Sequence, residues 1–142
     1  MPIDPYTLTH CLPPPPKKTV FAWYIQRSLP ATPINPGSAT IDAVGSSHAT
    51  LPSLAALPEP KQTSVSVITP PAATLEVLRE AGRLGIPAVW LQPGTFNDEV
   101  IKYARDEYPG EVVAGEEGGT RGSEGWCVLV DGERALKAAG KL

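Results

Sequence analysis

The chain has 142 residues, a length that fits one domain with a single hydrophobic core. Its net charge of -3 and its pI near 5.3 speak against a nucleic-acid or polyanionic partner, because clustered Lys and Arg usually meet such partners. No apolar run approaches the ~18 residues that a membrane span requires. These properties favour a soluble globular protein that binds neither nucleic acid nor a membrane.

The cysteines and the N-terminal residues bear on the compartment. Cys11 and Cys127 fit no metal-ligand spacing and make no disulfide framework, which favours a reducing compartment. Residues 1–18 lack the apolar centre of a secretory signal and the Arg-rich pattern of a transit peptide. We expect a cytoplasmic protein, and a mitochondrial location stays open.

Residues 1–17 are predicted to be a Pro-rich, irregular arm in front of a domain that spans residues 18–142. Four consecutive prolines at 13–16 favour an extended segment without N–H donors. Residues 6–12 have β-favouring side chains, so a short strand there is the alternative to a loose arm.

Residues 18–62 begin with helical periodicity and then become Pro-interrupted. Apolar side chains at helical spacing predict a helix over 18–29. A turn is expected at Asn35, Pro36 and Gly37, followed by a brief apolar piece over 39–44. One helical turn is predicted near residues 53–57.

Residues 63–94 carry the clearest pattern, a strand, a helix and a second strand. The apolar run 63–69 predicts a central strand, and Pro70 and Pro71 suit the start of a helix, where missing N–H groups cost little. Gly85 is a natural helix stop, and residues 88–91 form the next strand. This unit predicts two parallel strands joined by a crossover helix.

The remaining residues continue the alternation. Thr95 is expected to open a helix, with Asp98 completing an imperfect capping box, and a strand follows at 111–114. A Gly-rich loop at 115–125 precedes a last strand at 126–130 and a short C-terminal helix. The predicted fold class is therefore α/β: a parallel three-layer sandwich with helices on both faces of one sheet.

Several stretches resemble one protein family. They are WY at 23–24, TPINP at 32–36, SVSVITPP at 64–71, GIPAVWLQPG at 85–94 and GWCVLVDG at 125–132. Together they resemble the stand-alone CoA-binding domain proteins, most of all the fungal branch, over roughly residues 18–139. The resemblance implies a Rossmann-like fold related to the CoA-binding domain of succinyl-CoA synthetase, with CoA as the suspected cofactor.

The resemblance also implies a binding edge built from the ends of successive strands, which is where open parallel sheets collect ligands. Amide, hydroxyl and glycine positions there would meet hydroxyls, an adenine edge or phosphates. The residues of this edge are Asn35, Pro36, Thr69, Pro70, Gln92, Pro93 and Gly94. The alternative is that they are turn residues that only end the strands.

The chain departs from the family at its first strand. Relatives have an apolar strand and a glycine-containing turn that receives the phosphates, whereas this chain has prolines there and no glycine before Gly37. Lys17 and Lys18 would supply positive charge without that geometry. The first strand is therefore expected to be missing, or replaced by residues 6–12, in a central slot between the strands near Ile34 and Val67.

No catalytic constellation is recognised. His10 and His48 lie in irregular segments without a nucleophile motif, and the acidic residues of the Gly-rich loop are expected to be solvated. The first hypothesis is a non-catalytic module for CoA, acyl-CoA or a related nucleotide, with binding impaired by the lost turn. The alternatives are a structural or degenerate relative without ligand and, more weakly, an NAD(P)-linked oxidoreductase. An exposed sheet edge would favour self-association.

Overall fold

The computed structural model describes residues 3–6, 19–114, 133 and 136–137. In chain order its strands and helices are β1 (Ile3–Tyr6), α1 (Thr19–Gln26), β2 (Thr40–Ala43), β3 (Ser46–Ala49), β4 (Ser64–Val67), α2 (Pro71–Leu84), β5 (Ala88–Leu91), α3 (Asp98–Asp106) and β6 (Glu111–Val113). Two 3-10 turns, Leu54–Ala56 and Pro60–Gln62, precede β4. The predicted loop at 115–125 and strand at 126–130 lie outside the described residues.

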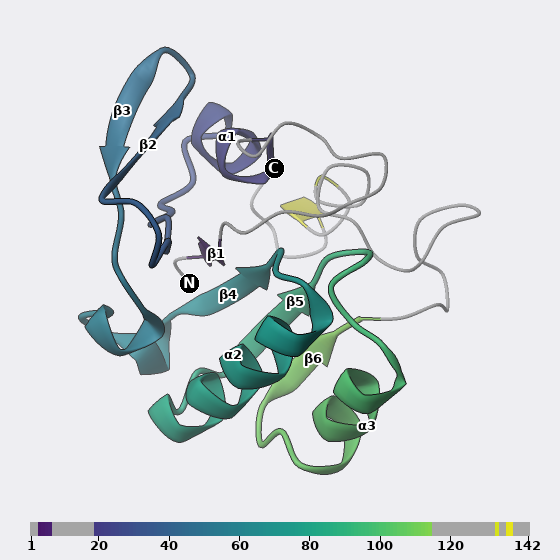
Figure 1. The fold of residues 1–142 in the computed structure, drawn as a ribbon. Coiled ribbons are helices and arrows are strands. Elements are labelled where there is room, and N and C mark those ends of the chain that lie inside the picture. The colour runs from purple at the N-terminus through teal and green to yellow at the C-terminus, as the bar shows by residue number, and fades with distance from the viewer. Residues whose placement is uncertain (1–2, 7–18, 115–132, 134–135, 138–142) are drawn as a thin grey trace.

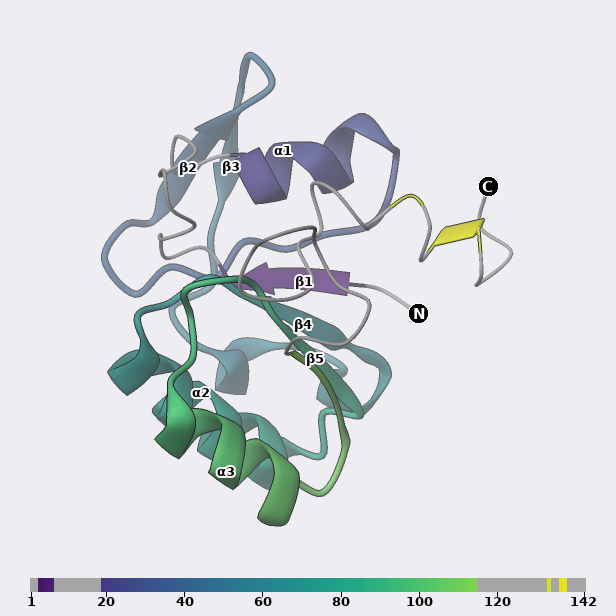
Figure 2. The same cartoon turned by 90° about the vertical axis from the view of Figure 1, so that its right-hand side faces the viewer.

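Four strands form one parallel sheet in the order β1-β4-β5-β6. Helix α1 covers one face of this sheet, and helices α2 and α3 cover the other (Figures 1 and 2). The three layers confirm the predicted α/β, Rossmann-like fold class. In the part of the chain that is described, no helix is long and apolar enough to cross a membrane.

The slot beside β4 is filled by β1, so the first strand is replaced rather than missing. Asp4 pairs with Val65 and Pro5 with Ser66 in parallel register. Only Tyr6 of the predicted replacement strand at residues 6–12 belongs to β1, where it is the last residue. Residues 7–12 lie outside the described part. The expected irregular arm therefore contains a strand at residues 3–6, although Pro5 has no N–H to donate to a ladder.

The segment near Ile34 does not join this sheet as expected. Ile34 forms an isolated parallel bridge with Leu51, while β2 and β3 make a separate antiparallel hairpin. The two residues at the hairpin tip, Val44 and Gly45, have φ of 51° and 75°. Positive φ at both positions defines a type I′ turn, which usually has Asn-Gly rather than a β-branched residue first.

Helix α2 begins and ends where the sequence predicts. Pro70 is extended and Pro71 is the first helical residue, so neither proline removes a bond inside the helix. Gly85 adopts φ of 73° and donates its N–H to the carbonyls of Ala81 and Gly82. The helix therefore runs its full 14 residues between Pro and Gly signals.

Helix α3 begins two residues later than predicted, counted from its N-cap. Its cap is Asn97, whose side chain accepts a hydrogen bond from the Val100 N–H at 3.0 Å. Thr95 instead donates its hydroxyl to the Gln92 carbonyl at 2.6 Å, so the expected capping box of Thr95 with Asp98 was wrong. The two acidic residues of the first turn still suit the positive end of the helix dipole.

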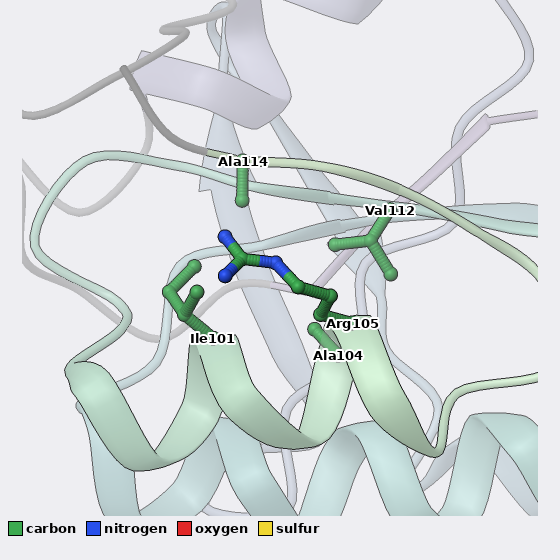
Figure 3. A pocket seen from close by; sticks show the side chains of 5 residues that line it. All are labelled: Ile101, Ala104, Arg105, Val112 and Ala114. Atoms are coloured by element: carbon green, nitrogen blue, oxygen red, sulfur yellow. The ribbon is translucent and has the colours of Figure 1, made fainter.

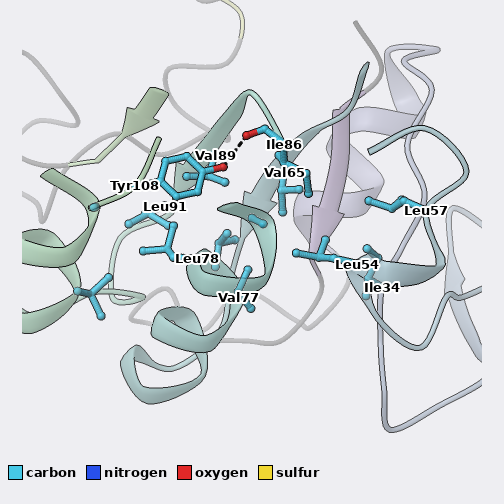
Figure 4. Packing of buried hydrophobic residues seen from close by; sticks show 14 residues of the cluster. Ile34, Leu54, Leu57, Val65, Val77, Leu78, Ile86, Val89, Leu91 and Tyr108 are labelled. Atoms are coloured by element: carbon cyan, nitrogen blue, oxygen red, sulfur yellow. Dashed lines mark hydrogen bonds between the residues drawn. The ribbon is translucent and has the colours of Figure 1, made fainter. Parts of the chain in front are cut away.

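The main core fills the space between the sheet and the two helices α2 and α3 (Figure 4). Alternate residues of β4 and β5 enter it, because side chains along a strand point to opposite faces. They are Val65, Val67, Val89 and Leu91. The Tyr108 hydroxyl donates to the Ile86 carbonyl at 2.7 Å at one end of this core.

A smaller core lies under α1 on the other face. Val20, Trp23 and Tyr24 pack there with Ile68 and the distant Leu136. The Arg27 guanidinium sits 4.1 Å from the Trp23 ring centroid and forms an ion pair with Glu133 at 2.8 Å. This ion pair holds the pKa of the exposed Glu133 carboxyl below its ordinary value. Two residues far along the chain, Glu133 and Leu136, thus pack against α1.

Candidate functional site

The carboxyl ends of β4 and β5 lie side by side, as the predicted binding edge requires. Val67 pairs with Leu91, and the Gln92 N–H donates to the Val67 carbonyl at 3.1 Å. Thr69 and Gln92, which follow these two strands, therefore lie at the same end of the sheet, where the strands have their carboxyl ends. Helix α2 starts at the same edge, directly after Thr69 and Pro70.

The Thr69 side chain is fully buried and turned inward. Its hydroxyl lies 2.7 Å from the Thr74 hydroxyl, and Thr74 also contacts the carbonyls of Thr69 and Pro70 at 3.1 Å. These contacts tie the first turn of α2 to the end of β4. Pro70 is exposed at this edge.

Gln92 is also fully buried. Its amide Nε2 donates to the Ser66 hydroxyl at 3.1 Å, and its carbonyl accepts from both the N–H and the hydroxyl of Thr95. Pro93 is buried beside it, whereas Gly94 is partly exposed and has φ of 85°. The backbone of Gly94, with no Cβ, is the part of this turn that a ligand can approach closely.

Asn35 and Pro36 lie in a different setting, a surface hollow of about 340 Å³. Its walls come from the turn after Ile34 and from the chain after β3. The lining residues are Asn35, Pro36, Gly37, Ser38, Ala39, Thr50 and Pro52. The structure thus brings two of the predicted residues together in a hollow whose other polar members, Ser38 and Thr50, sequence reasoning missed.

Tyr24 places a phenol on the α1 face of the sheet. Burial raises its pKa to about 12, and the Ser66 hydroxyl opposes part of that rise. The hydroxyl is close enough to Ser66 to be influenced by it, but no group in the described residues meets it in hydrogen-bonding geometry. Tyr24 lies at the apolar spacing of the predicted helix, so the sequence does not indicate that its hydroxyl is a buried polar group.

A second, smaller hollow of about 220 Å³ lies between α3 and β6 (Figure 3). Arg105 extends across it, between Ile101 of α3 and Ala114 beyond β6. Apart from the arginine its walls are aliphatic. Arg105 is in the last turn of α3, away from the strand ends that the sequence analysis singled out.

Other predicted groups fall outside a site. Lys17, Lys18 and His10 are outside the described residues. His48 packs edge-on against Phe21 at 5.1 Å between ring centroids, and its Nε2 lies 3.1 Å from the Ala43 carbonyl. Among the described residues there is no cluster of three His, Cys, Asp or Glu side chains that would hold a metal ion.

An open parallel sheet with helices on both faces, and small residues at its carboxyl edge, defines the Rossmann-like class of nucleotide-binding folds. The sequence model of the CoA binding domain matches residues 14–119. The chain therefore belongs to the CoA-binding domain family, as the resemblance indicated.

Solved structures share the fold of this chain. A hypothetical protein from Pyrococcus horikoshii is 25% identical with a TM-score of 0.68, over 94% of this chain and 82% of the other. A protein from Thermus thermophilus is 26% identical with a TM-score of 0.67, over 94% and 89%. A conserved hypothetical protein from Pyrococcus furiosus, 20% identical over 78% and 90% with a TM-score of 0.63, shares the fold. No curated protein sequence matches the chain significantly.

Proposed function

We propose that this protein is a binding module for CoA, acyl-CoA or a closely related nucleotide, without catalysis of its own. The match of residues 14–119 to the CoA-binding domain carries this proposal, because it includes the hollow at Asn35 and both strand ends. The ligand edge consists of Asn35, Pro36, Thr69, Pro70, Gln92, Pro93 and Gly94, with Lys17 and Lys18 near the phosphates.

The residues of this set fall into two groups according to the exposure of their side chains. Asn35, Pro36, Pro70 and Gly94 offer surface to a ligand. The side chains of Thr69 and Gln92 are buried and hydrogen-bonded, so they act by holding the strand ends and the start of α2 in place. The lost glycine turn removes N–H donors for phosphates, and we expect weakened binding for that reason.

Isothermal titration calorimetry with CoA, acetyl-CoA and NADH tests the proposal. We expect heat with CoA or acetyl-CoA and none with NADH. Asn35→Ala should weaken CoA binding, whereas Gln62→Ala, at an exposed position in the turn before β4, should leave it unchanged. Absence of heat with all three nucleotides would overturn the proposal.

A second candidate is a structural relative that binds no nucleotide. The observation that favours it is the internal satisfaction of Thr69 and Gln92, whose polar groups bond to the protein itself. The outer strands of the described sheet are β1 and β6. Under this second candidate function, the protein would self-associate by pairing along one of these outer strands. A dimer in sedimentation equilibrium, together with no nucleotide binding, would favour it.

A further inference from the structure

The hollow between α3 and β6 combines aliphatic walls with one positive charge. Ile101 and Ala104 line it from α3, Val112 and Ala114 line it from the other side, and the Arg105 side chain extends across it (Figure 3). Its volume of about 220 Å³ lies below the roughly 300 Å³ at which sites for small-molecule ligands begin. The hollow therefore suits a single apolar side chain beside a negative charge rather than a whole nucleotide.

Arg105 supplies the charge at this hollow. Its side chain is exposed, and the neighbouring Asp106 is already engaged by Lys102 at 3.3 Å. A guanidinium presents a planar fork of N–H donors that matches the two oxygens of a carboxylate. An acidic group that arrives at the hollow is therefore the complement of Arg105.

Strand β6 adds a backbone edge to this surface, since it is an outer strand of the described sheet. The Glu111 N–H donates to the Pro87 carbonyl at 2.9 Å, so the backbone groups of Glu111 point toward β5. Neighbouring residues of a strand point these groups to opposite sides, so the N–H and C=O of Val112 point away from β5. An extended chain can pair with them, as peptides do when they add a strand to the edge of a sheet.

The side chains along this edge are apolar on both faces. Val112 and Ala114 point into the hollow on the α3 side, and Val113 points to the opposite side, where it is 41% exposed. A strand added beside β6 would place alternate side chains over the hollow and over Val113. Apolar side chains would thus be matched on both faces, and an acidic one next to the hollow would reach Arg105.

We propose that β6 and the Arg105 hollow form a docking site for an extended segment of a partner protein, in which apolar residues are flanked by an acidic one. The segment adds a strand beside β6, seats one aliphatic side chain in the hollow and pairs its carboxylate with Arg105. A second copy of this chain fits less well, because pairing two β6 strands would bring both Arg105 side chains to the same face, where like charges repel. The proposal does not depend on nucleotide binding.

Fluorescence anisotropy with two labelled peptides tests the proposal. The probe has the sequence EVVVE, whose carboxylates at both ends serve either strand direction, and the control peptide is KVVVK. We expect the acidic peptide to bind and the basic one to bind about tenfold more weakly, as one charge-assisted contact implies. Equal affinities, or no binding of the acidic peptide, would overturn the proposal and leave the nucleotide-binding function standing.

Substitutions at Arg105 locate the binding. Arg105→Gln should weaken binding of the acidic peptide by about tenfold, and Arg105→Glu should reverse the preference in favour of KVVVK. Arg83→Gln is the matched control, because Arg83 is an exposed arginine in the last turn of α2 and outside the hollow. It should leave the affinity unchanged. An acidic peptide that binds wild type and Arg105→Gln equally well would overturn the proposal.

Sedimentation equilibrium separates the peptide from a second copy of the chain. We expect a monomer that binds the acidic peptide. A dimer that Val113→Lys dissociates, and that does not bind the acidic peptide, would assign the β6 edge to a second copy and overturn the proposal.

Discussion

The two faces of the sheet use the same strands in opposite ways. Toward α2 and α3, β4 and β5 present only aliphatic side chains. Toward α1, the same strands and their ends present Ser66, Trp90 and Gln92 beneath Tyr24. The α2–α3 side of the sheet is stabilised mainly by apolar burial, whereas on the α1 side the strands themselves carry buried hydrogen-bonding groups that need partners within the protein.

Two tyrosines make this contrast concrete. Tyr24 and Tyr108 are both buried, and in both cases burial raises the pKa to about 12. Tyr108, on the α2–α3 face, donates to a carbonyl, while the Tyr24 hydroxyl has no such partner among the described residues. Identical side chains therefore contribute differently to stability on the two faces.

The largest effect is expected from a cavity on the apolar face. Leu78 is fully buried in the main core, and Leu78→Ala should lower the free energy of unfolding by about 3 kcal/mol through lost burial and an unfilled cavity. Urea denaturation followed by circular dichroism measures this. Leu75→Ala, at a half-buried position of the same helix, is the control and should cost clearly less. Equal losses would show that the face is not packed as described.

Alkaline pH should act on both faces through the tyrosines. A pKa raised in the folded state means that the stabilisation is complete below the ordinary value of 10.0 and is lost as pH rises toward 12. For Tyr24 the loss should reach about 2 to 3 kcal/mol, since each pKa unit is worth about 1.4 kcal/mol. Unfolding free energies measured across this range should fall, and the fall should be smaller in Tyr24→Phe. A flat profile would contradict the burial of the two phenols.

Removing each phenol hydroxyl compares the faces at neutral pH. Tyr108→Phe leaves the Ile86 carbonyl without its donor and should cost about 1 to 2 kcal/mol. Tyr24→Phe removes a buried hydroxyl that has no described partner, so stability should stay the same or rise. The pair is measured by denaturant unfolding of both variants. A larger loss for Tyr24→Phe than for Tyr108→Phe would reverse the contrast.

The smallest effect is expected at the hairpin that packs against α1 through His48 and Phe21. Val44 is 53% exposed and has φ of 51°, a conformation that β-branched residues disfavour. Val44→Asn matches the type I′ turn and should raise stability by about 0.5 to 1 kcal/mol. Thermal unfolding would detect this, with Val113→Asn in β6 as an exposed-valine control that should bring no gain.

The middle of the fold was predictable because its signals are local. Prolines at one end, Gly85 at the other and apolar side chains between them determine α2, and the runs on either side determine β4 and β5. The hairpin was missed because Val44 is not a residue that marks a type I′ turn. Strand β1 was misplaced because Pro5 argues against a strand, and only the sheet supplies the pairing that overrides it.

The candidate site was predictable only as a set of positions. The ends of β4 and β5 lie side by side as expected, but Asn35 and Pro36 lie apart from them because the segment at Ile34 does not join the sheet. The sequence also does not show which side chains at the strand ends point inward. Gln92 follows Trp90 by two positions, so its side chain points to the same side of the sheet, under α1. There the Ser66 hydroxyl accepts a hydrogen bond from the Gln92 amide. Ser38 and Thr50 are separated by the whole hairpin, and nothing in either local pattern joins them in a hollow.

The ion pair of Arg27 with Glu133 joins residues 106 positions apart, and Leu136 reaches the same helix. The core on the α2–α3 face, in contrast, is built mostly from residues between β4 and β6, together with Ile34, Leu54 and Leu57 from the segment before β4. Closing a long loop costs more chain entropy than pairing neighbours, and such contacts slow folding. We therefore expect the layer of α2 and α3 to form first. The layer of α1 should pack onto the sheet only after Glu133 and Leu136 have reached it.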